Sequence, residues 1–404
     1  MRAALPRFAG FAAVLLLAAL LAHAGSARAA AKNKAVTLPI GYLQIVDDPR
    51  YEEDRLYARN LAQPTGRPDA GLETLIKESR FATSALGVTL TIERAEATDS
   101  AGLVEEIVRL HGRGVRFFVI DAPGTVVGEV AAATRGKELL LFNVSAADDA
   151  LRLGQCQAHL LHTIPSDAMR GDALAQYLVS RKWRKVLMLQ GPLADDALLA
   201  AAFARAAKRF GIKLVETRNF VLSNDPRQRE QGNVALLTAN ADYDAIFVAD
   251  SDGEFARGLP YRSVLPRPVV GSEGLVAAAW HWAWERHGAP QLSARFEKQA
   301  GRRMGESDWA AWIAGKAIVE AMQRTGGTDF KTLASYLRSA EITIDGFKGG
   351  KLSFRDWNRQ LRQPLLIATH NAVIERAPIE GFMHQHNKLD TLGYDRPEGG
   401  CKFQ

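Results

Sequence analysis

Polar side chains that could bind a small molecule stand directly after several short apolar runs of this 404-residue chain. Asp121 ends the run RFFVID, Asn143 and Ser145 follow LLLF, and Asp250 ends AIFVAD. Carboxylate, amide and hydroxyl groups can hydrogen-bond a solute without reacting with it. Loops that leave the carboxyl ends of parallel strands meet at one edge of a sheet, where open α/β folds bind ligands. These residues therefore predict a binding cleft.

Motifs for catalysis are missing from the sequence. It contains no G-x-S-x-G, H-E-x-x-H or Walker loop. The segment HGRG at 111–114 begins a G-x-G pattern, but Phe117 replaces the third glycine and the segment precedes a strand. His384-x-His386 with Asp390 has the residue types of a metal site, yet its glycine-rich surroundings favour a surface tail. We therefore expect no enzymatic activity, no cofactor and no metal site.

The first thirty residues predict export. Arg2 and Arg7 precede an apolar run over 11–22, and Ala27-Arg28-Ala29 supplies the small-x-small pattern of a signal-peptidase site. The apolar run is shorter than the roughly 20 residues that span a membrane, and no cysteine follows it for lipid attachment. Residues 1–30 are therefore interpreted as a signal peptide, and the mature protein as periplasmic and not membrane-anchored.

Charge and cysteine content add two further expectations. The chain carries a formal charge of +6, and three of its arginines lie in the signal segment, so the mature charge is only +3. Nucleic-acid binding is not expected, because no basic run is interleaved with aromatic residues. In an oxidising compartment Cys156 and Cys401 favour a disulfide that ties the C-terminal tail to the body. Two buried free cysteines are the alternative.

Short apolar runs alternate with amphipathic stretches, the pattern of βα units. Strands are predicted at 35–46, 88–93, 116–121, 139–144, 185–190, 213–220, 245–250 and 266–271. Helices are predicted at 72–86, around 103–110, and at 126–134, 168–181 and 198–210. Residues 273–340 are expected to be largely helical and are rich in tryptophan, and 347–374 return to strands. The fold class is α/β, with two doubly wound, Rossmann-like lobes joined by a hinge.

Four segments carry a resemblance to a known family: PIGYLQ, HTIPSDAMRGDALAQYL, AIFVADSD and FKGGKLSFRDWNRQ. With them the chain resembles type I periplasmic solute-binding proteins of the branched-chain amino acid class. Two further segments, WHWAWERHGAPQLSARF and DWAAWIAGKA, look like the branch encoded beside PQQ-dependent alcohol dehydrogenases. The resemblance implies one lobe from 36–163 plus 272–343, a second from 164–271 plus 344–380, and a tail over 381–404.

The resemblance also implies a function. Such a protein captures a small-molecule solute between its lobes and delivers it to the permease of an ABC transporter. The narrower branch links the solute to PQQ-dependent alcohol oxidation, as the quinone cofactor, an alcohol or its acid product, or a metal. The alternative is a sensory or accessory protein that docks on the dehydrogenase or on a membrane receptor.

Candidate ligand contacts follow from the loops that the resemblance places at the cleft. Relatives that bind amino acids hold the carboxylate with small hydroxyl residues and free helix N–H groups, a role that fits Thr125 and Ser145. Asp121 and Asn143 depart from that pattern and put amino-acid transport in doubt, although Asp121 could instead cap the following helix. The remaining candidates are Tyr42, Asp47, Gln190 and Asp250, and the indoles of Trp280, Trp282 and Trp284 could stack on a ring-shaped ligand.

Overall fold

The computed structural model describes residues 36–51, 66–223 and 225–403. Its first sheet has five strands, and the strand pairs described below are parallel. Its order is β2-β1-β3-β4-β5, with β1 paired to β3, β3 to β4 and β4 to β5 in parallel. The strands are β1 Val36–Ile45, β2 Val88–Ala97, β3 Phe117–Asp121, β4 Leu140–Asn143 and β5 Leu160–His162. The predicted signal peptide lies outside the described residues.

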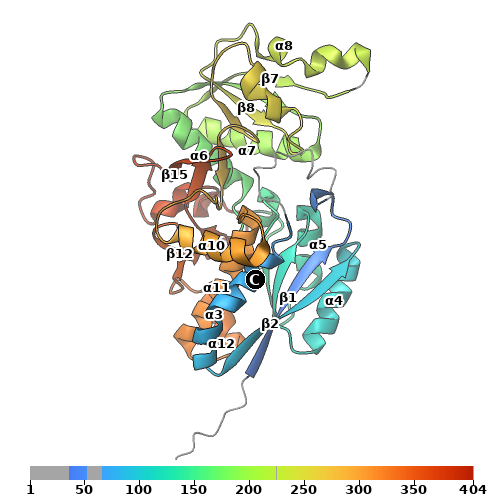
Figure 1. The fold of residues 1–404 in the computed structure, drawn as a ribbon, viewed down its shortest axis with the longest axis vertical. Coiled ribbons are helices and arrows are strands. Elements are labelled where there is room, and N and C mark those ends of the chain that lie inside the picture. The colour runs from blue at the N-terminus through green and yellow to red at the C-terminus, as the bar shows by residue number, and fades with distance from the viewer. Residues whose placement is uncertain (1–35, 52–65, 224, 404) are drawn as a thin grey trace, which may run out of the picture. The chain divides into compact units, whose positions relative to one another are not determined.

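Both faces of this sheet are buried, which explains the uninterrupted apolar runs. Successive side chains of a strand point to opposite faces, so Phe117 and Val119 pack in one core while Phe118 and Ile120 pack in another. The second of these cores is completed by α4 Ser100–Gly112 and α5 Gly124–Ala133, the first by α3 Asp69–Ala85 and three C-terminal helices (Figure 1).

The second sheet repeats the pattern with the order β7-β6-β8-β9, again with parallel pairing. Its strands are β6 Lys185–Gln190, β7 Lys213–Asn219, β8 Ala245–Ala249 and β9 Val269–Gly271. Helices α6 Asp167–Ser180 and α7 Ala194–Phe210 pack on one face, and the short helices α8 Val234–Thr238 and α9 Leu259–Arg262 on the other. Each sheet thus has a switch point where the strand order reverses, the usual place for ligands in doubly wound folds.

The C-terminal third combines helices with small antiparallel sheets. The helices are α10 Ala289–Ala300, α11 Glu306–Thr325 and α12 Phe330–Arg338. The sheets are ordered β10-β14-β15 and β11-β12-β13. Their strands are β10 Val276–Ala278, β11 Ile344–Asp345, β12 Lys351–Phe354, β13 Leu361–Arg362, β14 Leu365–Ala368 and β15 Val373–Ala377. Short 3-10 turns occur at Pro49–Tyr51, Asp149–Arg152, Pro226–Gly232, Ala256–Gly258, Lys388–Thr391 and Arg396–Glu398.

One sequence expectation differs from this arrangement. Residues 273–288 contain β10 and turns, so the helical prediction for 273–340 is wrong in its first part. The segment after residue 340 packs against both cores: Ile344, Leu352, Leu361 and Leu366 belong to the core of the first sheet, whereas Leu365 and Ile367 belong to the core of the second. The predicted lobe boundary at 343 stays a prediction.

Close approach of two helices explains one pair of glycines. A Cβ on Gly71 of α3 would lie 2.0 Å from the backbone oxygen of Asp308, and one on Gly315 of α11 would lie 2.1 Å from Leu75. Glycine is required at position 71, where a Cβ would overlap the backbone of α11, whereas a Cβ at position 315 would meet the end of a leucine side chain.

Buried polar side chains hold the chain crossing between the two sheets. The Gln360 amide donates to the carbonyl oxygens of His162 and Ile164, at 3.3 and 2.9 Å. The guanidinium of Arg152, 1 % exposed, donates to Gln360 Oε1 and to the same Ile164 carbonyl. The crossing is fixed by these bonds because each buried carbonyl would otherwise lack a donor.

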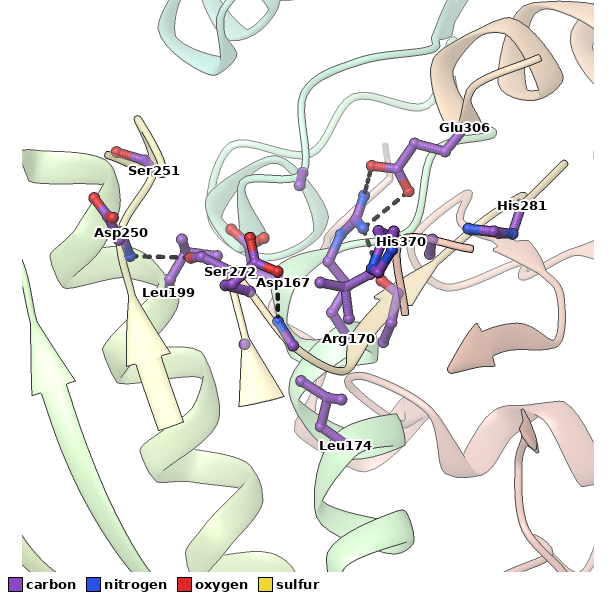
Figure 2. Close-up of a pocket in the computed structure, with 18 of the residues that line it drawn as sticks. Asp167, Arg170, Leu174, Leu199, Asp250, Ser251, Ser272, His281, Glu306 and His370 are labelled. Carbon is purple, nitrogen blue, oxygen red and sulfur yellow. Dashed lines mark hydrogen bonds and ion pairs between the residues drawn. The ribbon is translucent and has the colours of Figure 1, made fainter. Parts of the chain in front are cut away.

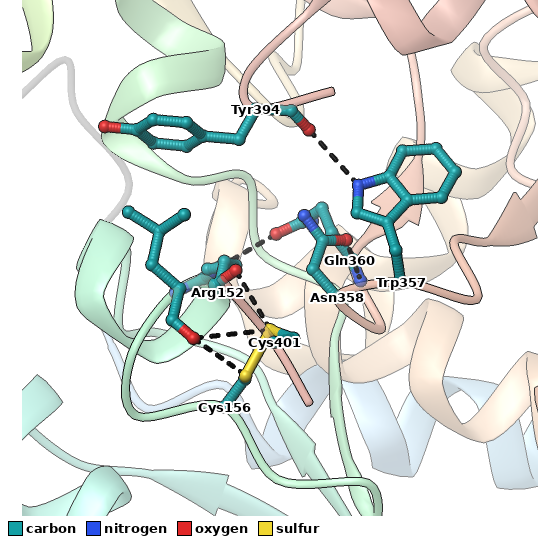
Figure 3. The surroundings of a disulfide bond; sticks show 8 residues. Arg152, Cys156, Trp357, Asn358, Gln360, Tyr394 and Cys401 are labelled. Atoms are coloured by element: carbon teal, nitrogen blue, oxygen red, sulfur yellow. Dashed lines mark hydrogen bonds between the residues drawn. A yellow bond between two sulfur atoms is a disulfide. The ribbon is translucent and has the colours of Figure 1, made fainter. Parts of the chain in front are cut away.

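The C-terminal tail is bonded to a loop of the first sheet and to a helix that covers the second. Cys401 forms a disulfide with Cys156 in the loop before β5, with the Cα atoms 5.7 Å apart (Figure 3). Further back along the tail, the Gly393 backbone N–H donates to Asp172 of α6 at 2.8 Å. The described tail is therefore an integral part of the fold.

Candidate functional site

A cavity of about 570 Å³ lies at the carboxyl ends of the parallel strands. One wall comes from the loop after β4 and the start of α6, and another from the loops after β8 and β9. Residues 276–282, the start of α11 and the turn between β14 and β15 complete it (Figure 2). The volume falls within the range of sites that enclose small molecules.

One ion pair joins two walls of the cavity. Arg170 of α6 donates to both carboxylate oxygens of Glu306 at 2.9 Å, and its guanidinium also donates to the Ala277 carbonyl (Figure 2). Glu306, the first residue of α11, accepts the Ala279 backbone N–H as well. Because both groups are fully engaged with each other, we infer that this pair positions the walls and does not provide a free charge for a ligand.

Replacing Arg170 with Met is expected to destabilise the fold by about 2–3 kcal/mol. Loss of one partner leaves the other charge unpaired in a partly buried setting; the side chains are 19 % and 32 % exposed, which moderates the cost. Urea unfolding followed by circular dichroism measures the change. The matched control is Arg109→Met, which breaks an exposed ion pair with Glu106 and should leave stability unchanged. Equal effects of the two substitutions would contradict the assigned role.

Two carboxyl groups of the cavity have strongly raised pKa values. Burial raises the pKa of Asp167 to about 7, and the neighbouring Asp149 and Asp148 raise it further while Arg170 opposes them. Burial also raises the pKa of Asp250 to about 7, with Asp252 and Asp196 adding to the shift. Asp250 accepts the Ala256 backbone N–H at 2.7 Å, and its own N–H donates to the Ser272 hydroxyl at 3.0 Å.

These shifts predict a pH dependence of stability. The ordinary pKa of both groups is 3.8, so between about pH 4 and pH 7 the native state holds protons that the unfolded chain has released. Their stabilising contribution is present below pH 4 and is lost as the pH rises through about 7. The free energy of unfolding of the wild type, relative to Asp167→Asn/Asp250→Asn, should fall between pH 5 and pH 8. A constant difference would contradict the raised pKa values; Asp47→Asn is the control.

Aromatic residues line the cavity beside these acids. Trp280 is 2 % exposed and stacks on Trp309 with ring centroids 6.3 Å apart. The guanidinium of Arg303 lies 3.6 Å from the ring centroid of Trp282. The indole Nε1 atoms of Trp280 and Trp282 are buried and have no hydrogen-bond acceptor among the described residues. The stacking role stays a prediction for these two, which line the cavity. Trp284 does not line it, and its Nε1 donates to the Phe347 carbonyl.

Of the eight predicted ligand contacts, Ser145 and Asp250 line the cavity. Ser145 also accepts the Ala122 backbone N–H at 3.2 Å. Asn143 is buried and shapes the loop after β4, since its Oδ1 accepts the Ala146 N–H and its Nδ2 donates to the Ala146 carbonyl. The remaining predicted contacts also lie outside the lining: Tyr42 in the core, Asp121 buried at the end of β3, Asp47 and Thr125 exposed, and Gln190 at the end of β6.

Asp121 is engaged by partners from its own lobe. Its carboxylate accepts hydrogen bonds from four side chains, at 2.9 to 3.4 Å: Tyr42, Arg50, Tyr51 and Arg67. The helix-cap interpretation is wrong, because α5 begins after Pro123 and has no side-chain cap. Asp48 joins the cluster through Arg50. The exits of β1 and β3 are thus occupied by a network of paired charges.

Sequence reasoning missed Asp167, Arg170 and Glu306. Ser166 caps α6 by accepting the Met169 N–H, and a capping serine directly after a predicted crossing is a signal that this helix starts at the cleft. No spacing could pair Arg170 with Glu306, because they are 136 residues apart.

Asp390, proposed with His384 and His386 as a weak metal candidate, is bound by Arg355 and Arg362. Within the described ranges no group of three His, Cys, Asp or Glu could hold a metal ion.

The fold matches solved structures over most of the chain, although no protein-family model and no curated protein matches its sequence. A leucine-, isoleucine-, valine-, threonine- and alanine-binding protein from Brucella ovis is 16 % identical, with a TM-score of 0.69, covering 92 % of this chain and 100 % of that one. A periplasmic ligand-binding protein of a branched-chain amino acid ABC transporter from Burkholderia xenovorans is 13 % identical, with a TM-score of 0.68, covering 90 % and 99 %.

A third solved structure is an ABC transporter solute-binding protein from R. palustris in complex with benzoate. It is 12 % identical, has a TM-score of 0.64, and covers 91 % of this chain and 100 % of that chain. The chain therefore has the two-lobed α/β fold of type I periplasmic binding proteins. None of the helices in its described ranges is both long and apolar enough to cross a membrane.

Proposed function

We propose that the protein is the periplasmic solute-binding component of an ABC importer, without enzymatic activity of its own. The observation that carries the proposal is the cavity of about 570 Å³, which lies where such folds bind solutes and is lined from both sheets. Ser145 and Asp250 are the proposed contacts that were also predicted from sequence. A permease is the partner that such a component requires.

The tryptophan-rich segments support a narrower proposal. WHWAWERHGAPQLSARF contributes Trp280 and Trp282 to the cavity, and DWAAWIAGKA lies in α11, whose first residue Glu306 also lines it. The segments that resemble the branch beside PQQ-dependent alcohol dehydrogenases thus lie at or next to the proposed site. We propose that the solute belongs to PQQ-dependent alcohol oxidation.

Thermal unfolding of the purified protein against a panel of solutes tests the binding function. The panel contains PQQ, short and aromatic alcohols with their acids, the amines corresponding to those alcohols, calcium and lanthanide ions, and branched-chain amino acids. A solute at 100 times its Kd stabilises the native state by about 2.7 kcal/mol, which is visible as a shift in Tm. No shift with any member would reject the proposal.

Cavity specificity is tested with a pair of matched variants. Ala147 lines the cavity, and Ala147→Trp should abolish the Tm shift because the indole fills the space. Ala132 is exposed on α5 and does not line it, so Ala132→Trp should keep the full shift. A shift that persists in Ala147→Trp would place binding outside the cavity.

A further inference from the structure

The acidic groups of the cavity restrict the class of solute, an inference that rests on the proposed function. Two arginines line the cavity, but Arg170 is paired with Glu306 and Arg257 is exposed. Four lining carboxyl groups have no ion-pair partner within the described ranges: Asp167, Asp250, Asp252 and Glu273. The buried Asp196 accepts the Ser251 backbone N–H and is a further acid without an ion-pair partner in the described ranges. The charge balance of these carboxyl groups, which come from two walls of the cavity, favours a positively charged ligand.

The indole groups provide a second and independent indication of a ligand. The Nε1 of Trp280 is a donor in a side chain that is 2 % exposed, and it has no acceptor among the described residues. A buried donor without an acceptor costs free energy, so a ligand oxygen that reaches it would gain a hydrogen bond. Trp282 offers a second buried N–H without an acceptor among the described residues, while a face of its ring is covered by the Arg303 guanidinium.

We propose that the solute is a small organic cation that also carries a hydroxyl or carbonyl oxygen. Its ammonium group faces Asp167 and Asp250, and its oxygen accepts a hydrogen bond from the indole N–H of Trp280 or Trp282. An amino alcohol has both features and remains compatible with a link to alcohol oxidation. Carboxylic acids and the multiply carboxylated quinone cofactor would be repelled by these carboxylates.

Isothermal titration calorimetry with matched probes tests the charge of the solute. Ethanolamine, ethylene glycol and glycolate share one skeleton and differ in charge, as do tyramine, tyrosol and 4-hydroxyphenylacetate. The titrations are made at pH 8, where Asp167 and Asp250 are mostly ionised. Whichever of ethanolamine and tyramine binds more tightly is expected to bind at least tenfold more tightly than the corresponding alcohol. The two acids are expected to give no heat of binding.

The outcomes separate this inference from the proposed function. If an acid or an alcohol binds as tightly as its amine, the cation inference is overturned while solute binding stands. If the amines do not bind but PQQ, an acid or an amino acid shifts the Tm, the cation inference is likewise overturned and solute binding stands. If none of these probes and no member of the panel binds, both proposals are rejected.

Substitutions test which groups contact the cation and the oxygen. Asp250→Asn and Asp167→Asn should each weaken amine binding about tenfold, whereas Asp47→Asn, on an exposed carboxylate outside the cavity, should not change it. Trp280→Phe keeps the ring but removes the N–H, so together with Trp282→Phe it should weaken tyramine several-fold and leave phenethylamine unchanged. Equal weakening of both amines would overturn the hydrogen-bond assignment, and thermal unfolding confirms that each variant is folded.

Discussion

Replacing Asp172 with alanine is expected to lower the free energy of unfolding by about 3–5 kcal/mol. The carboxylate is fully buried and bonded to Arg205, Arg209 and the backbone N–H of Gly393. Burial raises the pKa of Asp172 to about 6 despite the two arginines, so the ion pairs do not outweigh the cost of burying the charge. The large loss arises because alanine removes the buried countercharge of both guanidinium groups and the acceptor of the tail N–H. Arg205 keeps Glu398 and the Gly393 carbonyl, and Arg209 keeps that carbonyl alone.

Urea unfolding measures this loss of stability, and comparison with two further variants shows its origin. Asp172→Asn keeps an oxygen that can accept the Gly393 N–H and should cost less than alanine. Asp242→Ala removes the partner of an exposed lysine, Lys185, and should leave stability unchanged because exposed pairs contribute little. If Asp172→Ala behaves like Asp242→Ala, the buried cluster does not hold the tail.

Removing the disulfide is the second change with a large expected effect. Cys156→Ser with Cys401→Ser should lower the free energy of unfolding by about 2–5 kcal/mol, chiefly because the unfolded chain is no longer cross-linked. The bond joins residues 245 positions apart, a long loop whose closure restricts the unfolded ensemble strongly. Calorimetry of oxidised and reduced wild-type protein beside the double variant measures the difference.

Thiol labelling is the check on the pairing itself. Alkylation of the denatured, unreduced protein should modify neither cysteine, and both should react after reduction. Equal stability of the oxidised protein and the double variant would contradict the expected stabilisation, and labelling of both cysteines without reductant would contradict the bond.

The parallel sheets could be predicted closely because both of their faces are buried. Apolar runs such as KVLMLQ and AIFVAD leave little choice of structure, and β6 Lys185–Gln190 begins and ends as predicted. The helical prediction for 273–288 failed because the tryptophans at 280, 282 and 284 lie in a non-helical segment, and each of them packs against different neighbours. Large aromatic side chains do not reveal by their spacing which backbone carries them.

The candidate site could be predicted only in part. Asp250 and Ser145 follow central strands, and the general rule for strand ends places them at the cavity. Asp121 satisfies the same rule, but Arg67, 54 residues earlier, neutralises it with Arg50. Such pairing depends on the folded path of the chain and is invisible in local spacing, as is the ion pair between Arg170 and Glu306.

The link between Cys156 and Cys401 turns residues 156–401 into a closed covalent ring that contains all of the second sheet. A protease that cuts once at an exposed site such as Arg257 would therefore open the ring without releasing a fragment. The nicked protein should migrate as one species on a non-reducing gel and separate into two only after reduction. A single backbone cut in the second sheet therefore does not release that sheet from the rest of the protein.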